Sequence, residues 1–378
     1  MLSEEQLELR DTFRRFAERE IEPHAAEADE RAEYPWKSFE AYRNSGFVRL
    51  GYPEALGGEG ADTLTFAFLA EEVARVCGSS SLFVIISKLA MTPVLVHGSR
   101  ELQERYVPRV ASGELQASYC LSEPDAGSDV GSMSTRASRD GDSYVLRGTK
   151  SWITNAGISD LYVVFAKTDP DLGHRGISAF VVERDTPGLS IGDPENKMGM
   201  RGSPTCDVYL DDAVVPAANL IGEENQGFVY AMGALDSSRP LIGAQALGIA
   251  QGSLDAAVRY VKERRQFGQR IADFQGVQFM LADMVTQIEA ARLLVYEACS
   301  LFDAGDPRVS RMASMAKMFA ADTAMRVTTD AVQLFGGAGF TRRYPAERMM
   351  RDAKVTQIYE GTNQVQRVVI ARRLLEES

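Results

Sequence analysis

Two neighbouring stretches in the middle of the sequence combine residue types that could hold a flat, polar ligand. Cys120-Leu121-Ser122-Glu123-Pro124-Asp125-Ala126-Gly127-Ser128-Asp129 is predicted to end a strand in a turn rich in hydroxyls, glycine and backbone N–H groups. Such a turn can hydrogen-bond the polar edge of a ring or a phosphate, but it is also the pattern of an ordinary capped turn. One strand later, Trp152-Ile153-Thr154-Asn155 could supply a wall and a polar contact for an aromatic cofactor, and core packing explains the tryptophan equally well.

Two further stretches lie in the C-terminal part. Gln333-Leu334-Phe335-Gly336-Gly337-Ala338-Gly339-Phe340 closes a long helical pattern with glycines, which is typical of a helix C-cap and also lets a ligand approach the backbone. Ile358-Tyr359-Glu360-Gly361-Thr362-Asn363-Gln364 places an isolated glutamate at a predicted helix start. By residue type alone, Glu360 is ordinarily a solvated acid favoured by the positive end of the helix dipole.

Other chemistries find little support in the residue types. The four cysteines form no CxxC pair, and the three histidines are not spaced as metal ligands, so a zinc site, a dithiol or a Ser-His-Asp triad is not expected. We expect reduced, mostly buried thiols. A complete GxGxxG after a predicted strand is also missing, so a nucleotide cofactor would have to be held in another way.

The charge of the 378-residue chain argues against nucleic acid. It carries 41 basic and 53 acidic side chains, a formal net charge of −12, with a pI near 5.0. The charge is uneven, because residues 228–378 hold 16 acids and 19 bases whereas residues 1–227 hold 37 and 22. The basic excess lies in the C-terminal segment, so an acidic total does not exclude a polyanionic cofactor held by local arginines.

The composition and the N-terminal sequence favour an ordinary intracellular protein. Hydrophobic residues make up 45% of the chain, which is typical of a globular fold of two or three domains. The first residues lack the pattern of a signal peptide. The apolar run from Leu82 to Val96 contains Lys88 and Pro93, so no membrane-spanning segment is expected.

Three segments of different periodicity must position these residues. Residues 4–117 have helical spacing, and Ser3 with Gln6 predicts a capping box. From about residue 117 the pattern is that of strands, with Asp140-Gly141 as a hairpin turn. After Gly227 three long amphipathic helices follow, and the segment from Gly361 to Leu375 could supply a fourth surface for a bundle. We therefore expect domains at 1–117, 118–227 and 228–378.

Taken together, the motifs resemble the acyl-CoA dehydrogenase family over essentially the whole chain. The resemblance rests on their order and spacing: Ser122-Glu123-Pro124-x-x-Gly127-Ser128-Asp129, Arg264-x-x-Phe267-Gly268, the run from Gln333 to Gly337, and Tyr359-Glu360-Gly361-Thr362. Arg343 departs from the family pattern, which usually has an acid there. The resemblance implies an α+β fold with an N-terminal helical domain, a central β barrel-like domain and a C-terminal four-helix bundle.

The resemblance also implies that FAD lies in the cleft between the β domain and the bundle. The flavin would be contacted by Tyr119, Leu121, Ser122, Gly127, Ser128, Trp152 and Thr154. A neighbouring subunit of a homotetramer, a dimer of dimers, would contact mostly the adenosine and pyrophosphate end through Arg264, Phe267, Gln275 and the run that includes Gln333, Gly336 and Gly337. Thr362 and Gln364 would lie near the Glu360 loop. An arginine suits a pyrophosphate because it can donate paired, charge-assisted hydrogen bonds.

The implied reaction is α,β-dehydrogenation of an acyl-CoA thioester to the trans-2-enoyl-CoA. Glu360 would remove the α proton while the β hydrogen leaves as hydride to flavin N5, with the thioester oxygen held by the Glu360 N–H and a ribityl hydroxyl. Some members carry the base at the position of Ser238, which cannot serve, so we expect Glu360. The thioester and CoA would be contacted by Ser128, Asp236, Arg239 and Gly361, with a simple charge pair near a helix start as the alternative for Asp236 and Arg239.

The family further implies an electron-transferring flavoprotein as electron acceptor and a cytoplasmic enzyme of fatty acid β-oxidation or branched-chain amino acid catabolism. The helix pair from Tyr260 to Ala298 looks most like that of short-chain and short branched-chain members. Three alternatives stay open at this point. They are an oxygen-using acyl-CoA oxidase, a carrier-protein-bound substrate, and a nucleic-acid-binding member of the superfamily, although the last usually has a basic extension that this chain lacks.

Overall fold

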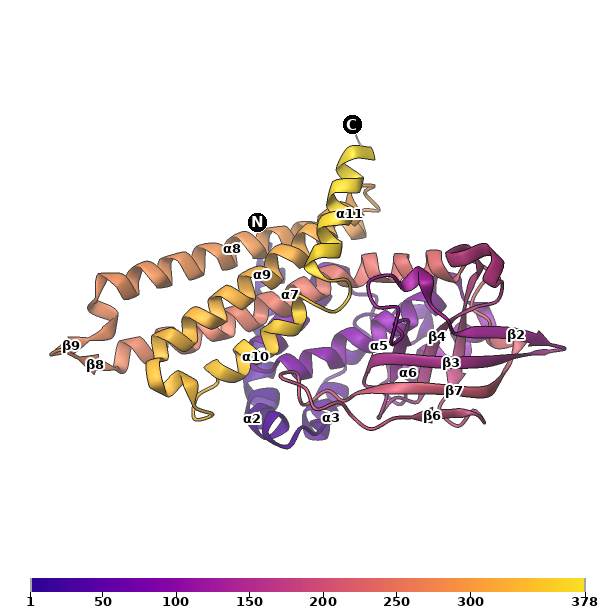
Figure 1. Ribbon diagram of the computed structural model, residues 1–378. Helices are drawn as coiled ribbons and strands as arrows, with labels where there is room; N and C mark the ends of the chain where they lie inside the picture. Colours follow the sequence, from indigo (N-terminus) through magenta and orange to yellow (C-terminus); the bar gives the residue numbers. More distant parts are fainter. Residues whose placement is uncertain (1, 377–378) are drawn as a thin grey trace.

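The computed structural model describes residues 2–376 and shows a helical N-terminal part, a β domain and a long helical bundle (Figure 1). The N-terminal part consists of helices α1 Glu4–Phe16, α2 Glu22–Arg31, α3 Trp36–Asn44, α4 Thr63–Val76, α5 Gly78–His97 and α6 Arg100–Ala111. The predicted capping box starts α1, because Gln6 N donates to Ser3 Oγ and Ser3 N donates to Gln6 Oε1.

Helix α5 passes through the core of the molecule. It is the one helix among residues 2–376 that is long and apolar enough to span a membrane, with a mean hydropathy of 1.7. This corrects the expectation that Lys88 and Pro93 interrupt the apolar run, since both lie inside a continuous helix. About three-quarters of the segment, 72%, is buried within the protein, so its packing against neighbouring helices accounts for its hydrophobicity.

One seven-stranded sheet forms the β domain. Its order is β1-β4-β2-β3-β7-β6, with β5 paired to β4, and only the β1–β4 and β2–β4 pairs are parallel. The strands are β1 Ala117–Cys120, β2 Arg136–Asp140, β3 Ser143–Thr154, β4 Leu161–Lys167, β5 Ile177–Glu183, β6 Leu189–Ile191 and β7 Thr205–Pro216. The Asp140-Gly141 hairpin is confirmed, since β2 and β3 pair antiparallel around it and Gly141 has φ 58°.

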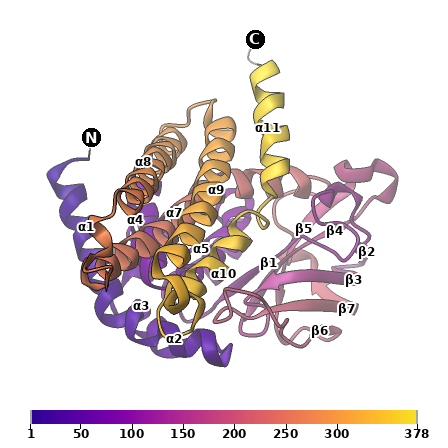
Figure 2. The same cartoon turned by 60° about the vertical axis from the view of Figure 1, so that its left-hand side comes forward.

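Three long helices run side by side through the bundle (Figures 1 and 2). They are α7 Gly227–Glu263, α8 Gln275–Asp303 and α9 Val309–Phe335, and the short strands β8 Arg265–Gln266 and β9 Gln269–Arg270 form a hairpin between α7 and α8. Two shorter helices follow, α10 Ala346–Thr356 and α11 Asn363–Glu376. The hairpin lies at the end of the bundle opposite the sheet (Figure 1).

The fourth surface of the bundle is not formed by the segment from Gly361 to Leu375, contrary to the expectation from the sequence. Helix α11 contacts α9 at its start and then rises away from the bundle, and it buries only Asn363 and Gln366 (Figure 2). Instead, α10 packs on α7 and α9, and α4 of the N-terminal part packs on α7 and α8. A helix does form in the segment 361–375, but most of it does not pack on the bundle.

Candidate active site

Glu360 lies in the turn between α10 and α11, in a backbone conformation that non-glycine residues rarely adopt. Its φ is 52° and that of Gly361 is 90°, so two consecutive residues are left-handed. Gln366 Nε2 donates to the carbonyls of both, at 3.2 and 3.0 Å, and the hydroxyl of Tyr359 donates to Gln245 Oε1 on α7. These contacts hold the turn against the bundle.

The Glu360 carboxyl group faces inward. Oε2 accepts a hydrogen bond from the Ser238 hydroxyl, whereas Oε1 is buried and has no hydrogen-bond partner in the structure. Burial raises the pKa of Glu360 to about 7, although Ser238, Arg239 and Lys317 act to lower it. A carboxyl group with a free buried oxygen and a pKa near neutrality can accept a proton from a bound molecule.

Helix α7 brings two more predicted residues to this point. Arg239 is almost fully buried and forms an ion pair with Asp236, and its Nε is buried without a partner. Tyr119, at the end of β1, donates from its hydroxyl to Ala231 O of α7 at 3.1 Å. Burial raises the pKa of Tyr119 strongly, and the charge of Glu360 adds to the rise, so the end of β1 lies within electrostatic reach of the glutamate.

The turn after β1 and the end of β3 are joined by hydrogen bonds. Ser151 N donates to Ser122 O at 2.9 Å, Lys150 Nζ donates to Leu121 O at 3.2 Å, and Ser118 Oγ donates to Thr154 O at 2.8 Å. The structure therefore brings together the predicted flavin contacts Tyr119, Leu121, Ser122, Trp152 and Thr154, with Gly127 and Ser128 exposed in the same turn.

The residues at this turn fit a flat cofactor with polar edges. Trp152 has φ 63° and leaves 62% of its surface exposed, which is unusual for a tryptophan in a strand. Thr154 follows it in the same strand, and the Ser122 turn is hydrogen-bonded to the neighbouring residue Ser151. An added Cβ at Gly127 would meet nothing within 4 Å, so the approach to its backbone is open. An exposed ring beside hydroxyl and N–H donors is the surface that an isoalloxazine ring requires.

The second group of predicted cofactor residues lies elsewhere. Gln333, Gly336 and Gly337 end α9, Gln275 begins α8, and Phe267 stands 94% exposed in the β8–β9 hairpin. Arg264 follows α7 directly, 28 positions after Asp236, which corresponds to about 42 Å along a helix. Within one chain these residues cannot meet the Trp152 turn.

A large cavity of about 900 Å³ marks this far end of the bundle. It is lined by the arginines Arg259, Arg264 and Arg343, by the glycines of the run 336–337, and by Tyr260, Phe335 and Tyr344. Gly336 has φ 59° and an added Cβ there would meet no atom, so the backbone is open to a ligand. Cationic, aromatic and open-backbone surfaces together suit an anionic nucleotide. Arg343, the departure from the family pattern, adds a positive charge here.

Thr362 and Gln364 lie next to Glu360, as expected. Thr362 Oγ1 accepts from Val365 N at 3.2 Å and so caps the start of α11, and Gln364 is exposed. The predicted substrate contact Gly361 lies in the turn itself.

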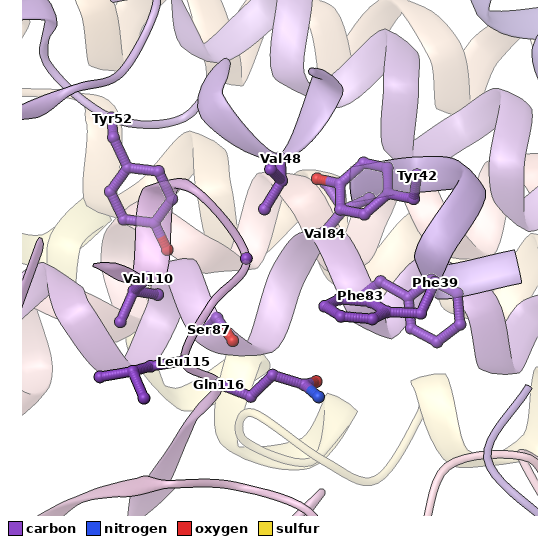
Figure 3. Close-up of a pocket in the computed structure, with 11 residues that line it drawn as sticks. Phe39, Tyr42, Val48, Tyr52, Phe83, Val84, Ser87, Val110, Leu115 and Gln116 are labelled. Atoms are coloured by element: carbon purple, nitrogen blue, oxygen red, sulfur yellow. The ribbon is translucent and has the colours of Figure 1, made fainter. Parts of the chain in front are cut away.

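A second cavity, of about 10 Å³, lies among α3, α5 and α6 in the N-terminal part (Figure 3). Its walls include Phe39, Tyr42 and Phe83, with the polar ends of Ser87 and Gln116 at its edge (Figure 3). This volume is about that of one water, so it cannot hold a substrate.

Sequence reasoning missed two buried lysines at the site. Lys150 pairs with Glu123 at 2.7 Å beneath the Ser122 turn, and both side chains are almost fully buried. Lys317 is fully buried on α9 and donates to the carbonyl of Gly361 at 2.8 Å. The available signal for Lys317 was its place on the same helix face as Ala313 and Ala320, since a lysine inside an apolar stripe needs a partner. Among the described residues no cluster suited to a metal is present, and all four cysteines are free and buried.

The chain matches known protein families along almost its whole length. Three domain families match in order, namely acyl-CoA dehydrogenase, N-terminal domain over residues 3–114, middle domain over 118–213 and C-terminal domain over 225–375. A probable acyl-CoA dehydrogenase of Mycobacterium leprae is 53% identical over 374 residues, which cover 99% of this chain and 96% of the relative.

Two solved structures share the fold closely. A chain in a structure described as the electron transferring flavoprotein of Acidaminococcus fermentans has a TM-score of 0.97 and 46% identity, with 99% of each chain covered. Butyryl-CoA dehydrogenase from Megasphaera elsdenii has a TM-score of 0.96 and 40% identity, again with 99% of each chain covered. The chain therefore belongs to the acyl-CoA dehydrogenase family, FAD-dependent oxidoreductases that act on the CH–CH group of an acyl-CoA.

Proposed function

We propose that this enzyme removes the α proton of an acyl-CoA thioester with Glu360, giving the trans-2-enoyl-CoA. The observation that carries the proposal is the Glu360 carboxyl group itself, with one buried oxygen free of any partner and a pKa raised to about 7. Such a group is matched to a proton transfer near neutral pH. FAD, when bound, supplies the acceptor for the β hydrogen.

The thioester must be polarised before a carboxylate can remove its α proton. We assign the backbone N–H of Glu360 as one donor to the thioester oxygen, because the turn at Glu360 and Gly361 is held in place by hydrogen bonds to the carbonyls of both residues. Closing the site over the substrate removes water and strengthens this interaction.

Residues near Glu360 would orient the substrate. Arg239 is a buried cation whose Nε lacks a partner, and Asp236 holds it in place. We assign these two residues, with Ser128 and Gly361, to the thioester and CoA. The exposed face of Trp152 and the donors of the Ser122 turn would hold the flavin ring.

The distant residues call for a second copy of the chain. Arg264, Phe267, Gln275 and the glycines after α9 would hold the adenosine and pyrophosphate end of FAD bound to a neighbouring subunit, since they lie too far from Trp152 in their own chain. We propose a homotetramer, a dimer of dimers, on this basis and on the family resemblance.

Short or short branched acyl chains are the proposed substrates, supported by the similarity to butyryl-CoA dehydrogenase. An electron-transferring flavoprotein is the proposed acceptor, and the similarity to a chain in a structure of such a flavoprotein supports it. The proposed location is the cytoplasm. Acyl-CoAs of graded length and branching, each tested with an artificial acceptor, would identify the substrate. Stoichiometric hydrogen peroxide instead of acceptor reduction would favour an oxidase.

Glu360→Gln tests the assignment of the base. The variant should bind FAD as the wild type does, and adding acyl-CoA should no longer bleach the flavin absorbance. Glu297→Gln, the same change at an exposed glutamate of α8, serves as the control and should bleach normally. Undiminished bleaching in Glu360→Gln would overturn the proposal.

A further inference from the structure

Lys317 is a lysine placed where the fold would ordinarily accept only apolar residues. It lies on the face of α9 that also buries Ala313, Ala316 and Ala320, and its own side chain is fully buried. A buried ammonium group is strongly disfavoured unless hydrogen bonds and charges compensate for the lost water. Its partners therefore indicate what it does.

Both hydrogen-bond acceptors of Lys317 belong to the segment that follows Glu360. Nζ donates to the backbone carbonyl of Gly361 at 2.8 Å and to Asn363 Oδ1 at 3.0 Å. These acceptors are neutral oxygens, so the positive charge of the ammonium group is not cancelled by them. Asn363 is fixed in turn, because its Nδ2 donates to Asp322 Oδ1 at 2.7 Å.

The carbonyl group that accepts the hydrogen bond from Lys317 belongs to the strained turn of Glu360 and Gly361. Glu360 has φ 52°, a conformation that costs free energy for a residue with a Cβ and persists only when its surroundings enforce it. The Gly361 carbonyl accepts from two buried groups at once, Lys317 Nζ at 2.8 Å and Gln366 Nε2 at 3.0 Å. This pair of donors fixes the peptide group that follows Gly361, and with it the turn that carries Glu360.

We propose that Lys317 is a positioning residue for Glu360, whose buried ammonium group fixes the left-handed turn and keeps the neighbouring carboxyl group ionised. The inference rests on the proposed role of Glu360 as the base. It assigns to Lys317 two separable effects, one through the hydrogen bond to Gly361 and one through charge.

The charges around Glu360 support the second effect. Ser238 and Arg239 face it from α7, Lys317 from α9 and Tyr119 from β1, and Tyr359 precedes it in the turn. Ser238, Arg239 and Lys317 lower the pKa of Glu360 against the larger effect of burial. In return, the charge of Glu360 favours the protonated form of Lys317, whose pKa burial lowers to about 8. Removing the Lys317 charge should therefore raise the pKa of Glu360 further.

Two substitutions separate the two effects. Lys317→Met removes both the donor and the charge at similar side-chain length, whereas Lys317→Gln removes the charge and keeps an N–H that can donate to Gly361. Lys88→Met is the matched control, because burial likewise lowers the pKa of Lys88 to about 8, but its ammonium group lies over the ring of Tyr52 at 5.3 Å. FAD content and the rate of flavin bleaching by butyryl-CoA would be measured from pH 6 to pH 9 for each variant.

The pH at half-maximal bleaching rate is the deciding measurement. We expect both Lys317 variants to shift it upward by about 0.3–0.5 unit, which corresponds to about two- to threefold slower bleaching below that pH. The limiting rate at high pH should fall more in Lys317→Met than in Lys317→Gln, and Lys88→Met should match the wild type.

The inference would be overturned if Lys317→Gln had the same pH at half-maximal bleaching rate as the wild type. A merely structural role would lower the bleaching rate without shifting that pH. If Lys317→Met fails to bind FAD, the result for Lys317→Gln alone decides the test. Bleaching by Glu360→Gln would instead show that the proposed function is wrong, and the two failures are thus distinguished.

Discussion

The hydroxyl of Ser238 on α7 donates a hydrogen bond to Oε2 of Glu360, although the two residues are 122 positions apart in the sequence. The resemblance described above implies that some members of the family carry the base at the position of Ser238. In this structure the two positions touch, so a carboxyl group on either element would reach the same point in the site. Here the serine keeps a supporting role as donor to the glutamate.

Ser238→Ala should raise the pKa of Glu360. The Ser238 hydroxyl lowers that pKa by donating to the carboxylate, and a hydrogen bond to a charged group contributes about 1.5–3 kcal/mol. Since Glu360 must be ionised to accept a proton, the bleaching rate of the wild type should rise with pH through about 7. In the variant the midpoint should lie about one unit higher.

The measurement is the single-turnover rate of flavin bleaching as a function of pH. Ser237→Ala is the control, because the Ser237 hydroxyl donates only to the carbonyl of Ala234 on its own helix. An unchanged or lower midpoint in Ser238→Ala would contradict the assigned hydrogen bond.

The sequence predicted the elements and the motifs better than their contacts. The three long helices and the β2–β3 hairpin follow from local periodicity and from the Asp140-Gly141 turn, because local patterns decide them. The hydrogen bond between Ser238 and Glu360 depends on how α7 packs against the loop before α11, and no local sequence pattern predicts that packing. Likewise, the sequence offers the segment of α11 as the fourth surface of the bundle, but α10 and α4 already cover the helices on which it would pack.

Trp152 should report FAD binding directly. The chain has only two tryptophans, Trp36 in the N-terminal part and Trp152 at the proposed flavin site. In Trp36→Phe the remaining indole is the exposed one of Trp152, so adding FAD to the apoprotein should quench most of its fluorescence. In Trp152→Phe the signal of Trp36 should change little. Stronger quenching of Trp36 than of Trp152 would place the flavin elsewhere.

Lys150→Met should destabilise the β domain and weaken FAD binding. Lys150 and Glu123 form a fully buried pair, and removing one partner of such a pair costs about 3–5 kcal/mol. Lys150 also donates to the carbonyl of Leu121, so its loss should loosen the turn beside Trp152. The free energy of unfolding in urea and the FAD content of the purified protein measure the two effects.

Lys37→Met, at an exposed lysine of α3, is the control for that variant and should leave both quantities unchanged. The pH dependence of the free energy of unfolding gives a second check on the pair of Lys150 and Glu123. Lys150 and the N–H donors lower the pKa of Glu123 from 4.5 to about 2, so its contribution to stability is present above pH 4.5 and lost as the pH falls toward 2. Equal loss of stability for Lys37→Met and Lys150→Met would rule out a special role for the buried pair.

Mixed assemblies should show that each FAD site is shared between two chains. Glu360→Gln disables the base, and Arg264→Ala disables the far end of the bundle, which in its own chain lies too distant from Trp152 to serve the same cofactor. In a two-fold dimer containing one chain of each kind, one site receives an intact Glu360 and the partner's intact Arg264, while the other site lacks both. Random co-assembly of two inactive variants should therefore restore roughly a quarter of the wild-type sites. If each site were built within one chain, every site in the mixture would keep a defect and no activity would return.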